Sequence, residues 1–203
     1  WAGYGSLPKL NAKDPQVRNY LFAGGNDAVG PYWMSQGVSG WRLDVATDVD
    51  PGSLQAPDNG FWKGFKKAIG EVSSDAVLIG EHWGHATSLL LGGEWDSVMN
   101  YRLQTALMSW MFDECRGWGC AGGKVFEDSE HNGASVLGPM QASTESQLEA
   151  KLLSIREDYP PQVWMSTMNL LGSHDTARVL FDLKKISSDS AEMARKKLKF
   201  LVS

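Results

Sequence analysis

The sequence predicts an α/β fold, in which a parallel β-sheet is covered by helices, and three observations lead there. Short apolar stretches alternate along the chain with longer amphipathic ones, an order typical of parallel sheets with crossover helices. The short stretches are apolar at successive positions, as expected of strands that are buried on both faces. Hydrophobic residues make up 42% of the 203-residue chain and charged residues 21%, so the chain can form a substantial core.

The first part of the chain predicts two helical pieces and then a strand. Asp14 can cap a helix in which Pro15 takes the first position, and a second helical piece is expected to end near Gln36. Residues 40–46 (GWRLDVA) are short, mostly apolar and entered through glycine. We therefore expect a buried strand there.

The remaining elements follow the same alternation. Residues 58–73 carry an apolar stripe at helical spacing, and Asp58 or Asn59 can cap this helix. The clearest strand is 76–81 (AVLIGE), where four apolar residues precede a glycine and a carboxylate. The later predicted elements are a strand at 96–100, a helix at 101–112, a loop insertion near 113–142, a helix at 144–158, a strand at 167–172 and a helix at 188–202.

Composition excludes several classes of function. The formal net charge is -5, and the pair Lys196-Lys197 is read as the solvated face of a helix, so no nucleic-acid partner is expected. No run of 18 apolar residues occurs, so no membrane span is expected either. Cys115 and Cys120 have no second pair at zinc spacing; they form a small-loop disulfide or remain free thiols.

Three of the predicted strands end in a carboxylate: Asp44, Glu81 and Asp175. In a (β/α) barrel the carboxyl ends of the strands meet at one face, where active sites are built. A retaining glycosidase needs one carboxylate as nucleophile and a second carboxylic acid as acid and base, about 5–5.5 Å apart. A third anionic group can stabilise the oxocarbenium-like transition state. Although a single acid after a strand is more often a helix cap, three of them in this arrangement predict a glycosidase site.

Neighbouring residues suit the same chemistry. Arg42 lies two positions before Asp44 and so points to the same side of the strand, where it can orient the carboxylate. Trp83 can supply an apolar wall that keeps Glu81 protonated as the acid. His174 can donate a hydrogen bond to a sugar hydroxyl, and Trp83 can stack on a sugar ring.

Three short motifs resemble conserved regions of the α-amylase family, glycoside hydrolase family 13. They are residues 40–46 (GWRLDVA), 80–83 (GEHW) and 171–176 (LGSHDT), in that order along the chain. The resemblance implies a catalytic TIM barrel and a double displacement with retention at the anomeric carbon. It also implies roles for five residues: Asp44 as nucleophile, Glu81 as acid/base, Asp175 as transition-state stabiliser, and Arg42 and His174 as supporting residues.

Further segments are similar to the neopullulanase, cyclomaltodextrinase and amylopullulanase branch of that family. Residues 5–11 (GSLPKLN) and 96–101 (DSVMNY) carry this likeness, which extends over nearly the whole chain outside 113–142. On this register the chain is one partial (β/α)8 TIM barrel covering about strands 4 to 7. We therefore expect residues 1–203 to be a fragment of one catalytic domain, inactive or prone to aggregation by itself, because half a barrel leaves open sheet edges.

The resemblance implies an α-glucan substrate such as starch, pullulan, cyclodextrin or malto-oligosaccharides. Two alternatives stay open: an α-glucanotransferase or sucrose/trehalose-type enzyme with the same three acids, and a non-catalytic amylase-like binding subunit. Acid/base glycoside chemistry requires no cofactor and no catalytic metal, while the family often holds calcium as a structural ion. The chain departs from the branch at Thr47-Asp48, where Asn-Glu is usual, and at His82, where Ile or Leu is common.

Overall fold

A computed structural model describes residues 5–52, 59–111, 142–176, 178–181 and 191–202. Within these residues four strands alternate with helices, and every strand pairing is parallel, as predicted. The strands are β1 (Gly40–Leu43), β2 (Val77–Gly80), β3 (Ser97–Asn100) and β4 (Met168–Asn169). The chain thus carries part of a (β/α)8 barrel.

Two compact units make up the chain. The first comprises Trp1–His82 with Ala86–Val98, and the second comprises Trp83–His85 with Met99–Ser203. Strand β3 contributes to both: its first half pairs with β2 through Ile79↔Ser97, and its second half pairs with β4 through Met99↔Met168.

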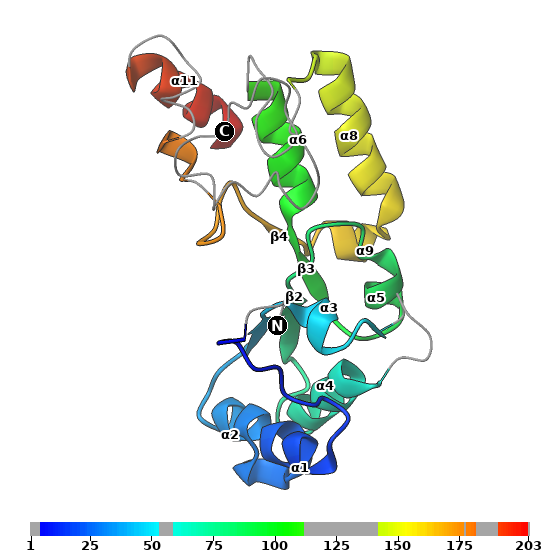
Figure 1. Cartoon of the computed structure of the whole chain (residues 1–203). Coiled ribbons are helices and arrows are strands. Elements are labelled where there is room, and N and C mark those ends of the chain that lie inside the picture. The colour runs from blue at the N-terminus through cyan, green and yellow to red at the C-terminus, as the bar shows by residue number, and fades with distance from the viewer. Residues whose placement is uncertain (1–4, 53–58, 112–141, 177, 182–190, 203) are drawn as a thin grey trace. The chain divides into compact units, whose positions relative to one another are not determined.

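The first unit contains β1, β2 and the helices drawn from blue to teal in Figure 1. Helix α1 begins at Pro15 with Asp14 as its cap, whose carboxylate accepts the amide of Gln16 at 2.7 Å, as the sequence predicts. The helices of this unit are α1 (Pro15–Arg18), η1 (Asn19–Ala23), η2 (Gly25–Asp27), α2 (Val29–Ser35), α3 (Ala46–Val49), α4 (Phe61–Val72) and α5 (Thr87–Leu91).

Aromatic side chains form the core between η1 and α4. Phe22 meets Phe61 edge to face with ring centroids 5.1 Å apart, and Phe65 at 5.9 Å. Glycine permits this close packing, because a Cβ at Gly64 would lie 2.8 Å from the ring of Phe22. The apolar stripe predicted for 58–73 is therefore the face of α4 that covers this core.

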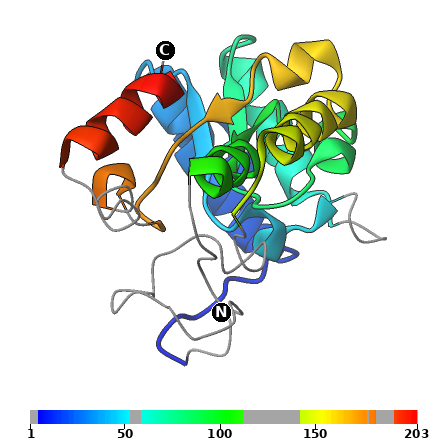
Figure 2. The same cartoon turned by 90° about the horizontal axis from the view of Figure 1, so that it is seen from above.

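The second unit is built on two long helices, α6 (Tyr101–Met111) and α8 (Glu145–Asp158), which lie side by side in both views (Figures 1 and 2). Helix α8 begins with a capping box, in which Thr144 and Gln147 satisfy each other's backbone amides. The helices of this unit are α6 (Tyr101–Met111), α8 (Glu145–Asp158), α9 (Pro161–Trp164) and α11 (Ala191–Val202). None of the described helices is long and apolar enough to cross a membrane.

Two expectations about the strands need correction. Of the strands that the structure describes, β3 alone is buried at all four positions, whereas both residues of β4 are exposed, so the expected burial of every strand on both faces is wrong. The strand predicted at 167–172 is limited to two residues. Beyond Asn169 the carbonyl of Leu171 accepts a hydrogen bond from Nε2 of Gln104 at 3.2 Å. The loop predicted at 113–142, with Cys115 and Cys120, lies almost wholly outside the described residues.

Candidate active site

Asp44 and Glu81 come to neighbouring positions because of the register of β1 and β2. Leu43 pairs with Gly80, and the amide of Glu81 donates to the carbonyl of Leu43 at 3.0 Å. Each acid is thus the first residue after its strand, at the carboxyl edge of a parallel pair.

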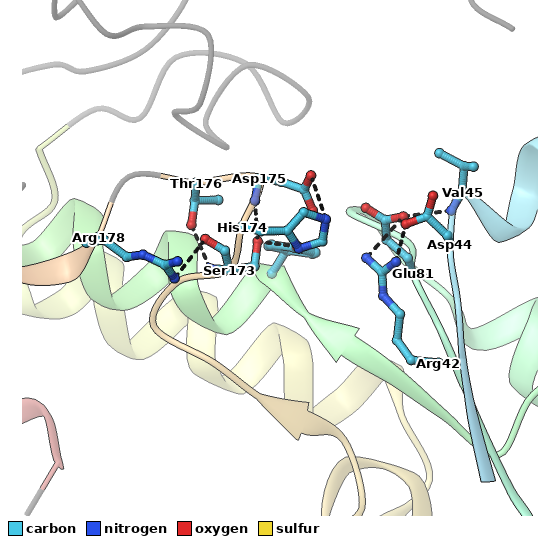
Figure 3. A network of polar contacts seen from close by, with 10 residues as sticks. Arg42, Asp44, Val45, Glu81, Ser173, His174, Asp175, Thr176 and Arg178 are labelled. Atoms are coloured by element: carbon cyan, nitrogen blue, oxygen red, sulfur yellow. Dashed lines mark hydrogen bonds and ion pairs between the residues drawn. The ribbon is translucent and has the colours of Figure 1, made fainter. Parts of the chain in front are cut away.

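A single guanidinium contacts both carboxylates. Nη1 of Arg42 forms an ion pair with Oδ1 of Asp44, and Nη2 lies 3.3 Å from Oε2 of Glu81 (Figure 3). The side chain of Asp44 is 70% exposed and that of Glu81 only 7%. Arg42 therefore orients both the exposed Asp44 and the enclosed Glu81. The predicted pairing of Arg42 with Asp44 is confirmed.

The backbone of Val45 also holds Glu81. Its amide donates to Oε2 of Glu81 at 2.7 Å, and its φ is 38°. A β-branched residue rarely adopts this left-handed conformation, which costs on the order of 1–3 kcal/mol and is found mainly at functional sites. Sequence reasoning missed this contact, since a backbone amide has no signature in the sequence.

A buried carboxylate anchors the segment that follows Asp44. Asp50 is fully buried and accepts the backbone amides of Gly52 at 3.1 Å and Phe61 at 2.7 Å, so it caps helix α4 from a distance in the chain. The N-cap position of α4 is Gly60 rather than the predicted Asn59, although Oδ1 of Asn59 accepts the amide of Phe61 at 3.0 Å; Asp58, the other predicted cap, lies outside the described residues.

A pocket of about 410 Å³ opens beside Asp44 within the first unit. Its walls are mainly apolar and include Trp41, Leu43 and Phe65, while Arg42 and Asp44 supply charge. An apolar pocket with a few convergent polar groups is the usual form of a small-molecule site.

In the second unit a tight turn carries His174 and Asp175 (Figure 3). The amide of Ser173 donates to Oγ1 of Thr176 at 2.9 Å, and the amide of Asp175 donates to Oγ of Ser173 at 3.1 Å. Nε2 of His174 lies 3.3 Å from Oδ1 of Asp175. The structure therefore brings these two predicted site residues together.

Trp83 stacks on a tyrosine of the second unit. Its ring lies parallel to that of Tyr101, with centroids 3.6 Å apart and planes inclined by 9°. One face of the Trp83 indole is thus used inside the protein. Its predicted contact with a sugar, and its predicted role as an apolar wall for Glu81, stay predictions.

Known proteins identify the family. A family model described as "Alpha amylase, catalytic domain" matches residues 2–202 of the chain. The chain belongs to this family. Its sequence is 35% identical to an amylopullulanase of Thermoanaerobacter thermohydrosulfuricus, over 98% of this chain and 13% of that protein. It is 32% identical to neopullulanase 2 of Thermoactinomyces vulgaris, over 86% of this chain and 23% of that protein.

Solved structures agree with this assignment. A debranching enzyme from Nostoc punctiforme superposes with a TM-score of 0.67 at 29% identity, over 89% of this chain and 32% of that chain. The chain thus spans a minor part of the length of the relatives it matches. The predicted family and the predicted barrel fold are confirmed.

Within the α-amylase family the two groups of site residues stand as follows. Asp44, Glu81 and Arg42 form one contact group in the first unit, and His174 and Asp175 form another in the second. The meeting of Asp175 with the other two acids stays a prediction. Among the described residues no three His, Cys, Asp or Glu side chains lie close enough together to hold a metal ion.

Proposed function

We propose that this protein is a retaining α-glucan hydrolase in which Asp44 is the nucleophile, Glu81 the acid/base and Asp175 the stabiliser of the transition state. The observation that carries the proposal is the guanidinium of Arg42, which contacts both Asp44 and Glu81. A shared guanidinium keeps two carboxyl groups within a few ångströms of each other, which fits the separation of about 5–5.5 Å that retention needs.

The two acids differ in a way that suits their proposed roles. Asp44 lines the pocket and its side chain is exposed, so its carboxylate is accessible to an anomeric carbon. Arg42 remains charged at every working pH and orients that carboxylate for attack. Glu81 is enclosed, and the Val45 amide fixes its orientation, which suits an acid/base that must be held in position.

The reaction then proceeds in two displacements. Asp44 attacks the anomeric carbon while Glu81 gives its proton to the leaving oxygen, and a glycosyl ester forms on Asp44. Glu81 next takes a proton from water, which attacks the anomeric carbon and releases the sugar with its configuration retained. Asp175 and His174 contact the sugar ring during both steps. The side chains themselves supply acid, base and nucleophile, so the proposal requires no cofactor.

The substrate class follows from the named relatives. Amylopullulanase and neopullulanase point to α-glucans, and the chemistry of the three acids is common to starch, pullulan, cyclodextrin and malto-oligosaccharides. We also propose that residues 1–203 belong to one catalytic barrel completed by further chain, because the amylopullulanase relative is matched over only 13% of its length.

The decisive experiment is Asp44→Asn in the natural polypeptide that carries this chain. Turnover of pullulan and maltotriose should decrease roughly 10³-fold or more, because the covalent step is lost. Asp27→Asn, at an exposed carboxylate in η2, is the matched control and should keep normal activity. Near-normal turnover by Asp44→Asn would show that the assignment of the nucleophile is wrong. Products longer than maltotriose would identify a glucanotransferase.

A further inference from the structure

We propose that Tyr101 and Ser173 are positioning residues that hold the backbone of Asp175 where its carboxylate acts, an inference that rests on the role proposed above for Asp175. Neither residue need touch the substrate. A chain of contacts runs from the first turn of α6 to the Asp175 amide, entirely within the second unit.

Tyr101 is a rigid starting point for this chain of contacts. It is the first residue of α6 and is fully buried. The parallel stack with Trp83 restricts rotation of its ring. Its hydroxyl oxygen lies 2.9 Å from Oγ of Ser173, so a buried and oriented group meets the turn that carries Asp175.

Ser173 passes this constraint to Asp175. Its Oγ accepts the Asp175 amide at 3.1 Å (Figure 3). Because the same oxygen lies 2.9 Å from the Tyr101 hydroxyl, it joins the tyrosine to the backbone of Asp175. The Ser173 amide in turn donates to Thr176 at 2.9 Å, which closes the turn from the other side. The Ser173 hydroxyl thus links Tyr101 directly to the backbone of Asp175.

A second residue on the same face of α6 supports the turn. Gln104 lies three positions after Tyr101, and residues at this spacing share a helix face. Its Nε2 donates to the carbonyl of Leu171 at 3.2 Å and lies 3.4 Å from Oγ1 of Thr176. The helix therefore holds the turn on both sides of Asp175, which a single packing contact would not achieve.

Placement of this kind matters for rate because the charge of a transition-state stabiliser must lie at a defined point. A displacement of about 1 Å of a catalytic group can cost roughly 10²-fold in rate. Loss of the Tyr101 hydroxyl should allow a smaller shift. We therefore expect Tyr101→Phe and Ser173→Ala each to reduce kcat roughly 10-fold with KM nearly unchanged. The reason is that the weakened interaction, the one between Asp175 and the reacting sugar, is strongest in the transition state.

The experiment measures kcat and KM of these two variants in the natural polypeptide. Tyr159→Phe, at another buried tyrosine of the second unit, and Ser166→Ala, whose hydroxyl bonds to carbonyls of its own turn, are the matched controls and should keep the wild-type kcat. Ser173→Thr retains the hydroxyl and should recover most of the rate. If Tyr101→Phe fails to fold, the difference in kcat between Ser173→Ala and Ser173→Thr tests the inference in its place.

A double variant separates a positioning role of Tyr101 from a purely structural one. The kcat of Tyr101→Phe is measured on an α-glucosyl fluoride in the Asp175→Asn background. If Tyr101 acts through Asp175, its removal there should leave the residual kcat unchanged. An equal loss in both backgrounds, or wild-type kcat for both Tyr101→Phe and Ser173→Ala, would overturn the inference. Near-normal turnover by Asp175→Asn itself would instead refute the proposed function.

Discussion

A methyl group added at Gly80 tests how tightly the strand before Glu81 is packed. A Cβ at Gly80 would lie 2.2 Å from Cδ2 and Cε3 of Trp95, and Trp95 is only 1% exposed. Carbon atoms in contact are about 3.5 Å apart, so the indole would have to move by more than roughly 1 Å in a site without free space. Overpacking of this kind should lower the free energy of unfolding by about 1–3 kcal/mol.

The matched control is the same substitution at Gly70. This glycine lies on the exposed side of α4, and a Cβ there would meet nothing within 4 Å. Alanine is favoured over glycine in helices by about 0.8–1 kcal/mol, so Gly70→Ala should raise stability. One chemical change is thus expected to have opposite signs at the two sites.

Urea unfolding of the natural polypeptide measures both effects. Gly80→Ala should lower the midpoint and Gly70→Ala should raise it, with unchanged slopes. Trp95→Leu should cost less in the Gly80→Ala background than in the wild type, because it removes the clashing ring. An unchanged midpoint for Gly80→Ala, or equal costs of Trp95→Leu in both backgrounds, would refute the argument from packing.

Three further predictions concern stability. Asp50→Ala should lower the free energy of unfolding by about 2–3 kcal/mol, since the Gly52 amide loses its carboxylate acceptor and the Phe61 amide keeps only Asn59; a loss below about 0.5 kcal/mol in urea unfolding would contradict this. Thr144→Ala removes the capping box of α8 and should cost about 1 kcal/mol, read from the urea midpoint against Ser166→Ala. Burial lowers the pKa of Lys151 below its usual value of 10.5, so as the pH rises toward 10.5 the folded protein releases this proton before the unfolded chain does. The stability of the wild type relative to Lys151→Met should therefore increase with pH across that window, and a flat or falling difference in urea titrations would show that the burial has no such effect.

The sequence by itself determined the order of the elements and the identity of the acids. Apolar runs ending in Asp44 and Glu81 predict strands that end in carboxylates, because short, mainly apolar runs bounded by glycine favour strands of a parallel sheet. The spacing of Arg42 and Asp44 predicted their ion pair, because side chains two positions apart in extended backbone point to the same side. Asp14 and Pro15 marked the start of α1 through backbone chemistry that needs no distant partner.

Only the tertiary structure decided which distant groups meet. The contact of Arg42 with Glu81 depends on the pairing of Leu43 with Gly80, and no local pattern specifies that register. Tyr101 and Ser173 are 72 positions apart in the chain and Gln104 and Leu171 are 67 apart, yet each pair is in contact. Local propensity acts over a few residues, whereas these contacts form only when separate elements pack together and their buried polar groups need partners.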